Sequence, residues 1–218
     1  MERIVSTYGL DIMVAFGVTL VCSLTAITVA MTVGLPLALG LRSRSTLIRV
    51  CCRGYVEVMR GSPLLLLLFL VYYGGPSLGI TLDAVSVGVI GLGLYGAGFY
   101  AEIFRAGMIA VPNGQTEVAR LMGFPGPHIV LRIQIPQMLP IILPPSVGQA
   151  IVILKESSVL SIITVGELTK MTTQISNETF SVTLPFLIAA ILYWVGAEAL
   201  SAAGIVVTRR LTSPGLRP

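Results

Sequence analysis

The segment TEVARLMGFPGPHIVLRIQIP, residues 116–136, differs in character from the rest of this sequence. It combines short helix-forming runs with three spaced prolines, a glycine suited to a turn and charges of both signs. The whole chain is 55% hydrophobic and only 11% charged, whereas roughly a quarter of the residues of a typical globular domain are charged. The contrast indicates a chain built for lipid that carries one polar segment near its middle.

Five windows of the sequence contain no charged residue, and each is long enough, or nearly so, to cross a membrane. They are residues 12–41, 61–82, 84–101, 133–154 and 179–197. Because a helix needs about 20 apolar residues to cross a bilayer, we predict an all-α polytopic membrane protein with five spans in a single transmembrane domain, residues 1–218. The first window exceeds one straight span, so it tilts or breaks at Pro36. Its non-basic start and its length argue against a cleaved signal peptide.

The basic residues predict the orientation, because they remain on the cytoplasmic side of a membrane. Segments expected on one side hold eleven arginines, whereas those on the other side hold only Arg3 and Lys170. We therefore predict a bacterial cytoplasmic (inner) membrane protein with its N-terminus outside and its C-terminus inside. The eleven are Arg42, Arg44, Arg49, Arg53, Arg60, Arg105, Arg120, Arg132, Arg209, Arg210 and Arg217.

Several classes of function find no support in the sequence. The net charge of +4 follows from the predicted topology and does not indicate nucleic-acid binding. The three cysteines and the single histidine, His128, show no metal-binding spacing. The sequence also lacks a phosphate-binding loop, a G-x-S-x-G elbow and an H-E-x-x-H zinc site. We expect no catalytic residue, metal or cofactor, and any nucleotide chemistry requires another chain.

By the charge bias, residues 116–136 lie in the cytoplasm between the third and fourth spans. Pro112 and Asn113 suit the start of a short amphipathic helix, and Gly123 suits a left-handed residue at its end. Residues 124–127 form a turn, and a second short helix is expected to stop before Pro136. Four apolar side chains would be exposed unless a partner covers them, which favours docking over a solvated connector. They are Val118, Leu121, Met122 and Phe124.

Residues 100–145 resemble the permease signature of ATP-binding-cassette (ABC) importers, specifically the polar amino-acid uptake family. That signature reads E-A-A, then a glycine four residues later, then I-x-L-P. Here it reads Glu117-Val118-Ala119, Gly123 and Ile133-Gln134-Ile135-Pro136, with Val118 and Ile135 as conservative departures. The likeness extends from about residue 10 to residue 210. We name residues 107–136 the coupling loop, and the resemblance assigns ATPase docking to Glu117, Val118, Ala119, Arg120, Gly123, Phe124, Ile133 and Pro136.

The resemblance implies a type I importer fold and a complex of several chains. Two permease subunits, identical or related, would pair over two cytoplasmic ATP-binding subunits, and each coupling loop would insert into a groove on an ATPase. An extracytoplasmic solute-binding protein would deliver a polar amino acid or a related compound. Closure of the ATPase dimer would then move the loops and switch the helices between two rigid-body states.

Two adjacent charges within the fourth span are the first candidates for the substrate path. Ionisable residues inside a membrane are costly and mark a functional site or a compensated pair. Glu156 is suited to the ammonium group of an amino acid, and Lys155 to its carboxylate or to balancing Glu156. The alternative is a structural ion pair at the subunit interface. Weaker candidates are Tyr72, Tyr100 and Glu102, for which membrane-interface anchoring or packing is the alternative.

Small residues recur at regular spacing in the third span. Gly93, Ala97 and Ala101 lie four residues apart, a spacing that lets a neighbouring helix approach closely.

Two other classes of function are the alternatives to an ABC importer permease. A self-contained secondary transporter or channel without an ATPase partner would need no docking loop. A membrane scaffold would explain the loop but not Lys155 and Glu156.

Overall fold

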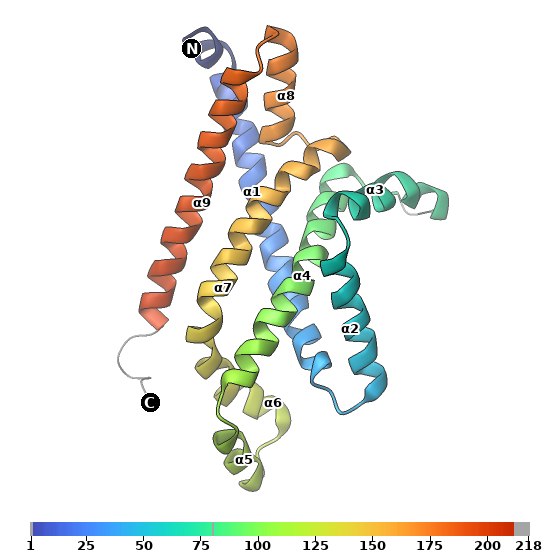
Figure 1. Ribbon diagram of the computed structural model, residues 1–218, viewed down its shortest axis with the longest axis vertical. Coiled ribbons are helices and arrows are strands. Elements are labelled where there is room, and N and C mark those ends of the chain that lie inside the picture. Colours follow the sequence, from blue (N-terminus) through green and yellow to red (C-terminus); the bar gives the residue numbers. More distant parts are fainter. Residues whose placement is uncertain (1, 80, 212–218) are drawn as a thin grey trace.

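The computed structural model describes residues 2–79 and 81–211, and every regular element in these ranges is helical (Figure 1). The long helices run side by side, and α5 and α6 protrude at one end. In chain order the elements are α1 (Glu2–Leu41), α2 (Thr46–Gly61), α3 (Leu64–Gly74), η1 (Gly75–Leu78), α4 (Ala84–Ala110), α5 (Asn113–Leu121), α6 (Gly126–Ile129), η2 (Val130–Gln134), α7 (Ile135–Glu156), η3 (Ser157–Ile163), α8 (Leu168–Thr179) and α9 (Thr183–Leu211).

Among the described residues, four helical stretches are long and apolar enough to cross a membrane: Ser6–Leu41, Ala84–Ala110, Gly126–Ile163 and Thr183–Arg210. A fifth crossing exists only if α2 and α3 are taken together as one broken span. The first span is one helix in the structure, because α1 continues through Pro36 to Leu41 without a break.

The second predicted span is not the straight helix that its charge-free window suggested. The window begins at Gly61, where α2 ends, and its apolar part forms α3, which is bent by 102° from α2. Pro63 explains the break, because a proline disfavours the helical conformation of the residue before it, and Ser62 is extended with φ −99° and ψ 142°. Arg49 and Arg53, expected in a loop, and Arg60, expected just beyond it, consequently lie on the amphipathic helix α2.

The core of the bundle forms where α1 packs along α4. A Cβ atom at Gly93 would lie 2.7 Å from Val29 Cγ1, and one at Gly34 would lie 2.8 Å from Tyr100 Cβ. Ala97 and Ala101 are completely buried on the same helix as Gly93. The small residues thus serve close packing of the two helices, as their spacing indicated.

The entry into α7 also differs from the prediction. The second short helix of the coupling loop does not stop before Pro136, because α6 continues through the π-helical turn η2 into α7. In that turn the N–H of Ile135 donates to the carbonyl of Val130, five residues earlier. The wider turn accommodates the missing N–H donor of Pro136, which then occupies the first turn of α7.

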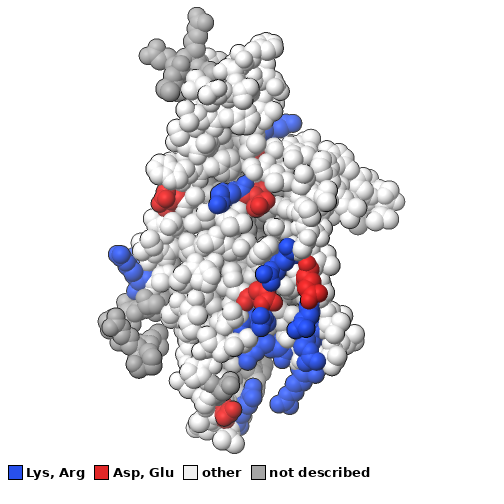
Figure 2. Space-filling view, viewed as in Figure 1, with Lys and Arg blue, Asp and Glu red and all other residues white. Residues whose placement is uncertain are grey.

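The last span is longer than the window 179–197 indicated. Helix α9 begins at Thr183 and continues past the exposed Glu198 to Leu211, so Arg209 and Arg210 lie in its last turn rather than in a tail. Most Lys and Arg side chains visible in Figure 2 gather in the half of the molecule that contains α5 and α6. This gathering agrees with the predicted orientation, which remains a prediction.

Candidate functional site

The coupling loop is built around α5 and a left-handed glycine. Helix α5 begins after Pro112, as the sequence indicated, and its C-terminal turn leads to Gly123 with φ +82°. The N–H of Gly123 donates to the backbone carbonyl of Arg120 at 3.0 Å, and the N–H of Phe124 donates to the backbone carbonyl of Ala119 at 3.1 Å. These bonds reverse the chain, and only glycine adopts the required φ without steric cost.

The outer face of the loop is apolar and uncovered. The exposed fractions are 56% for Val118, 88% for Leu121, 71% for Met122 and 41% for Phe124. Ala119, by contrast, is only 4% exposed. A shallow hollow of about 450 Å³ lies between α5 and the start of α7, and Val118, Met122, Phe124 and Ile133 contribute to its lining.

The remaining docking candidates differ in exposure. The two charged ones, Glu117 and Arg120, are exposed on α5, whereas Pro136 is half-buried in the first turn of α7. The ring of Phe124 stacks on exposed His128, with centroids 4.9 Å apart and planes 8° from parallel. The loop therefore presents an apolar surface with charges of both signs at its edge.

Lys155 and Glu156 end α7 at mid-depth of the bundle. Ile153 packs at Gly96 near the middle of α4, and Leu154 packs at Gly196 near the middle of α9. Lys155 is exposed and Glu156 is half-buried. In the described part of the chain, no ion pair or hydrogen bond joins these two side chains to each other.

The weaker candidates for the substrate path have partners within the chain. Tyr100 is completely buried and donates a 2.9 Å hydrogen bond to the carbonyl of Ser146, which favours a packing role. Glu102 accepts hydrogen bonds from Arg105, the shorter of them 2.6 Å long. The hydroxyl of Tyr72 is 3.3 Å from the hydroxyl of Thr164. These residues do not converge with Lys155 and Glu156 on one described pocket.

A family profile matches most of the chain. Residues 30–213 match the family described as "Binding-protein-dependent transport system inner membrane component". The chain belongs to this family. Its members are permeases of ABC importers, in which a separate ATPase subunit hydrolyses ATP. The permease is accordingly a multi-pass protein of the inner membrane, and the resemblance drawn from residues 100–145 is confirmed.

Individual relatives agree with the family match. The probable amino-acid ABC transporter permease protein YckA of Bacillus subtilis is 32% identical over 178 residues, 82% of this chain and 79% of that protein. The arginine transport system permease protein ArtQ of the same organism is 32% identical over 160 residues, 73% of each chain.

Solved structures confirm the fold. The crystal structure of an amino acid ABC transporter with histidines has a TM-score of 0.84 and 33% identity, covering 94% of this chain and 96% of that one. The inward-facing MetNI methionine ABC transporter has a TM-score of 0.81 at 17% identity, covering 94% and 97%. The permease therefore has the all-helical fold of ABC importer transmembrane subunits.

One buried acid was missed by the sequence analysis. Glu167 is fully buried at the start of α8, where its carboxylate accepts hydrogen bonds from the N–H groups of Thr169 at 2.9 Å and Lys170 at 2.8 Å. Burial raises the pKa of this carboxyl, and the hydrogen bonds act in the opposite direction. An acid followed by a polar helical run is an N-cap signal in the sequence, but the signal gives no indication of burial.

Proposed function

We propose that this permease forms the membrane pathway of a binding-protein-dependent ABC importer for a polar amino acid or a related compound. The names of two relatives support the substrate class, since one is described as an amino-acid permease and the other as part of an arginine transport system. The observation that carries the proposal is the coupling loop, whose apolar face is exposed beside its charged residues at one end of the bundle.

The coupling loop is the contact with the ATPase. Leu121 and Met122 extend from α5 with more than two thirds of their surface exposed, and burial of such side chains in a partner's groove is favourable. The turn at Gly123 holds them at a fixed angle to α7, because α6 runs through η2 into that helix. A displacement of the loop is thus transmitted along α7 toward Lys155 and Glu156.

The complete transporter contains two permeases, identical or related, and two cytoplasmic ATP-binding subunits. A solute-binding protein docks on the opposite, outer face. The permease itself hydrolyses no ATP, and the chemical energy enters through the coupling loops. The gathering of basic residues at the loop end supports a cytoplasmic location for that end.

Lys155 and Glu156 are the charges on the substrate path. They lie at mid-depth, are accessible on the surface of the single chain and form no described pair with each other. An amino acid carries one ammonium, which suits Glu156, and one carboxylate, which suits Lys155, and a contact with either group is enough to place this pair of residues on the path. Adjacent helical residues point about 100° apart, so one of them faces the substrate and the other faces the second permease.

The substrate class is tested by competition. Cells that express the complete transporter take up a labelled polar amino acid, and unlabelled amino acids, sugars and short peptides are added in excess. We expect only amino acids or their conjugates to reduce uptake. Competition by sugars or longer peptides, with none by amino acids, would refute the proposed substrate.

A further inference from the structure

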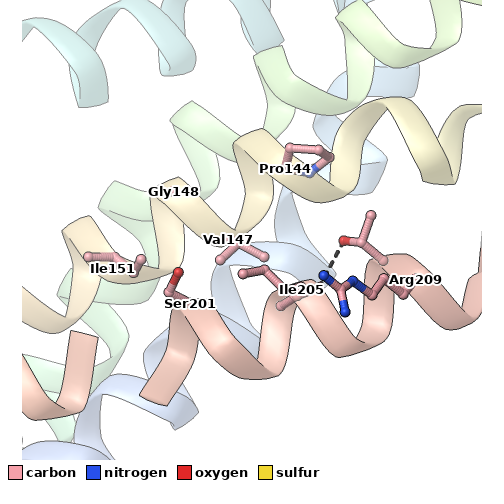
Figure 3. A pocket seen from close by; sticks show the side chains of 9 residues that line it. Pro144, Val147, Gly148, Ile151, Ser201, Ile205 and Arg209 are labelled. Atoms are coloured by element: carbon pink, nitrogen blue, oxygen red, sulfur yellow. Dashed lines mark hydrogen bonds between the residues drawn. The ribbon is translucent and has the colours of Figure 1, made fainter. Parts of the chain in front are cut away.

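A hollow outside the proposed substrate path lies between α7 and α9. It has a volume of about 400 Å³ and is lined by one face of each helix (Figure 3). Ile151 and Ser201 lie at one end, whereas Pro144 and Arg209 lie at the other. The lining residues are Pro144, Val147, Gly148, Ile151, Ser201, Gly204, Ile205, Thr208 and Arg209.

Two glycines explain why the hollow exists. A Cβ atom at Gly204 would collide with Val147, so this glycine lets α9 approach α7 closely. A Cβ atom at Gly148 would meet nothing within 4 Å, so the space beside it is open. The helices therefore touch along Val147 and Gly204 and leave a groove over Gly148.

The groove is apolar along its length and cationic at one end. The hydroxyl of Thr208 donates to the carbonyl of Gly204 at 2.8 Å, which satisfies this donor within the helix. Arg209 lies in the last turn of α9, where the apolar span ends, and Arg210 follows it. The guanidinium carries five N–H donors in a geometry that suits phosphate. None of the described lining residues is acidic.

The occupant of such a groove must combine an apolar chain with an anionic head at the membrane boundary. We propose that an anionic phospholipid binds here, with an acyl chain along α7 and α9 and its phosphate at Arg209. Basic pockets between membrane helices on the cytoplasmic side are known to favour such headgroups. Pro144 and Ile151 are seven residues apart on α7, so the groove is roughly 10 Å long at 1.5 Å per residue. This length suits part of an acyl chain, whereas a packed partner helix would need a longer groove.

Charge complementarity favours lipid over the second permease as the occupant. A partner helix would satisfy the apolar lining, but it would have to place an anion opposite Arg209 at the headgroup level, where lipid phosphates already lie. The bound lipid would bridge α7, which carries the coupling motion, and α9. The inference requires only that the chain is a membrane permease and does not depend on its substrate.

The test measures lipid retained by the purified complete transporter in nanodiscs containing phosphatidylglycerol and phosphatidylcholine. Native mass spectrometry counts the lipids that remain bound after release from the disc. Arg209→Gln removes the cation, and Gly148→Leu places a side chain in the groove from a Cβ position that has nothing within 4 Å. The matched controls are Arg210→Gln, next to the groove but outside its lining, and Gly17→Leu, a glycine of α1 with open space around its Cβ position.

We expect the wild-type transporter and both controls to retain phosphatidylglycerol in preference to phosphatidylcholine. Arg209→Gln should reduce this retention about fivefold, and Gly148→Leu should reduce retention of both lipids. Unchanged retention in both groove variants would overturn the proposal. A disulfide between Gly148→Cys chains of two permeases, in a background with Cys22, Cys51 and Cys52 replaced by serine, would assign the groove to the partner instead. Monodisperse elution of each variant establishes that it is folded.

Discussion

The hydroxyl of Tyr193 donates a 2.7 Å hydrogen bond to the carboxylate of Glu167, which joins α9 to the start of α8. Helix α1 meets the same point, because the N–H of Leu168 donates to the hydroxyl of Thr19 at 3.0 Å. Helix α1 is thereby held to α8 and α9, which are far from it in sequence, around one buried acid. A buried network of this kind fixes the position of α8 only while every member is satisfied.

Tyr193→Phe should destabilise the permease by about 1.5–3 kcal/mol, the usual range for a hydrogen bond to a charged group. Glu167→Gln should also destabilise it, because the amide NH2 would face donors instead of acceptors. In the double variant the loss should be smaller than the sum of the single losses. Thermal unfolding of the purified transporter measures all three. Tyr73→Phe is the control, since that hydroxyl is exposed and its bond to Ile162 is 3.4 Å long; an equal loss in the control would contradict the role of Glu167.

Gly123→Val should release the ATPase from membranes or uncouple ATP hydrolysis from uptake. The left-handed backbone conformation of Gly123 costs a residue with a side chain about 1 kcal/mol or more, so the turn should shift and move Leu121 and Met122. Gly114→Val is the control, because Gly114 lies in the same loop with open space and no positive φ. The readout is the amount of ATPase that sediments with membranes. Normal ATPase recruitment and uptake in Gly123→Val would show that coupling does not require the fixed geometry of this turn.

A charge reversal in α5 tests the docking surface separately from its backbone. Glu117 is exposed, so Glu117→Lys should leave the amount of inserted permease unchanged while it reduces ATPase recruitment. Recruitment is measured by co-purification of the two subunits. Full co-purification at physiological salt would exclude Glu117 from the contact.

Glu156→Gln should raise the half-saturation for uptake about tenfold, when the solute-binding protein is held saturating. This follows because a charge-assisted hydrogen bond is roughly twice as strong as a neutral one, and about 1.4 kcal/mol corresponds to a factor of ten. The control is Glu178→Gln, which changes a glutamate of α8 outside the mid-depth region. If the two charges form a structural pair instead, Glu156→Gln lowers membrane abundance and the added change Lys155→Met restores it. Restored abundance with normal transport in the double variant would rule out substrate contact.

Reporter fusions test the orientation. An enzyme that is active only outside the cytoplasm should be active when fused after Ser176 in α8 and inactive when fused after residue 218. The opposite pattern would contradict an outer location for the N-terminus and a cytoplasmic location for the coupling loop.

The parts of this fold that depend on local chemistry were predictable from the sequence. The four unbroken spans follow from long apolar windows, and the left-handed Gly123 follows from a glycine at the end of a short amphipathic helix. Pro63 also indicates the helix break locally, but the break was missed because residues 61–82 contain no charged residue and therefore indicated one span. The π-helical turn before Pro136 was not predictable, because a proline normally ends the preceding helix.

The site was predictable only where it faces outward. The exposure of the apolar residues on α5 follows from the amphipathic pattern and could be predicted from the sequence, whereas docking of an ATPase on them stays a prediction. The roles of Tyr100 and Glu167 depend on partners 46 and 26 residues away in sequence, Ser146 and Tyr193. No local pattern indicates such contacts, which form only when the helices pack.

The central claim is tested most directly by transport in proteoliposomes that contain the permease and its ATPase. Vesicles are prepared with ATP on the side of the coupling loop and with the solute-binding protein and a labelled polar amino acid on the other side. We predict accumulation of the amino acid that requires both ATP and the binding protein. Accumulation by the permease alone, driven by an imposed ion gradient without ATP, would contradict the account and indicate a self-contained secondary transporter.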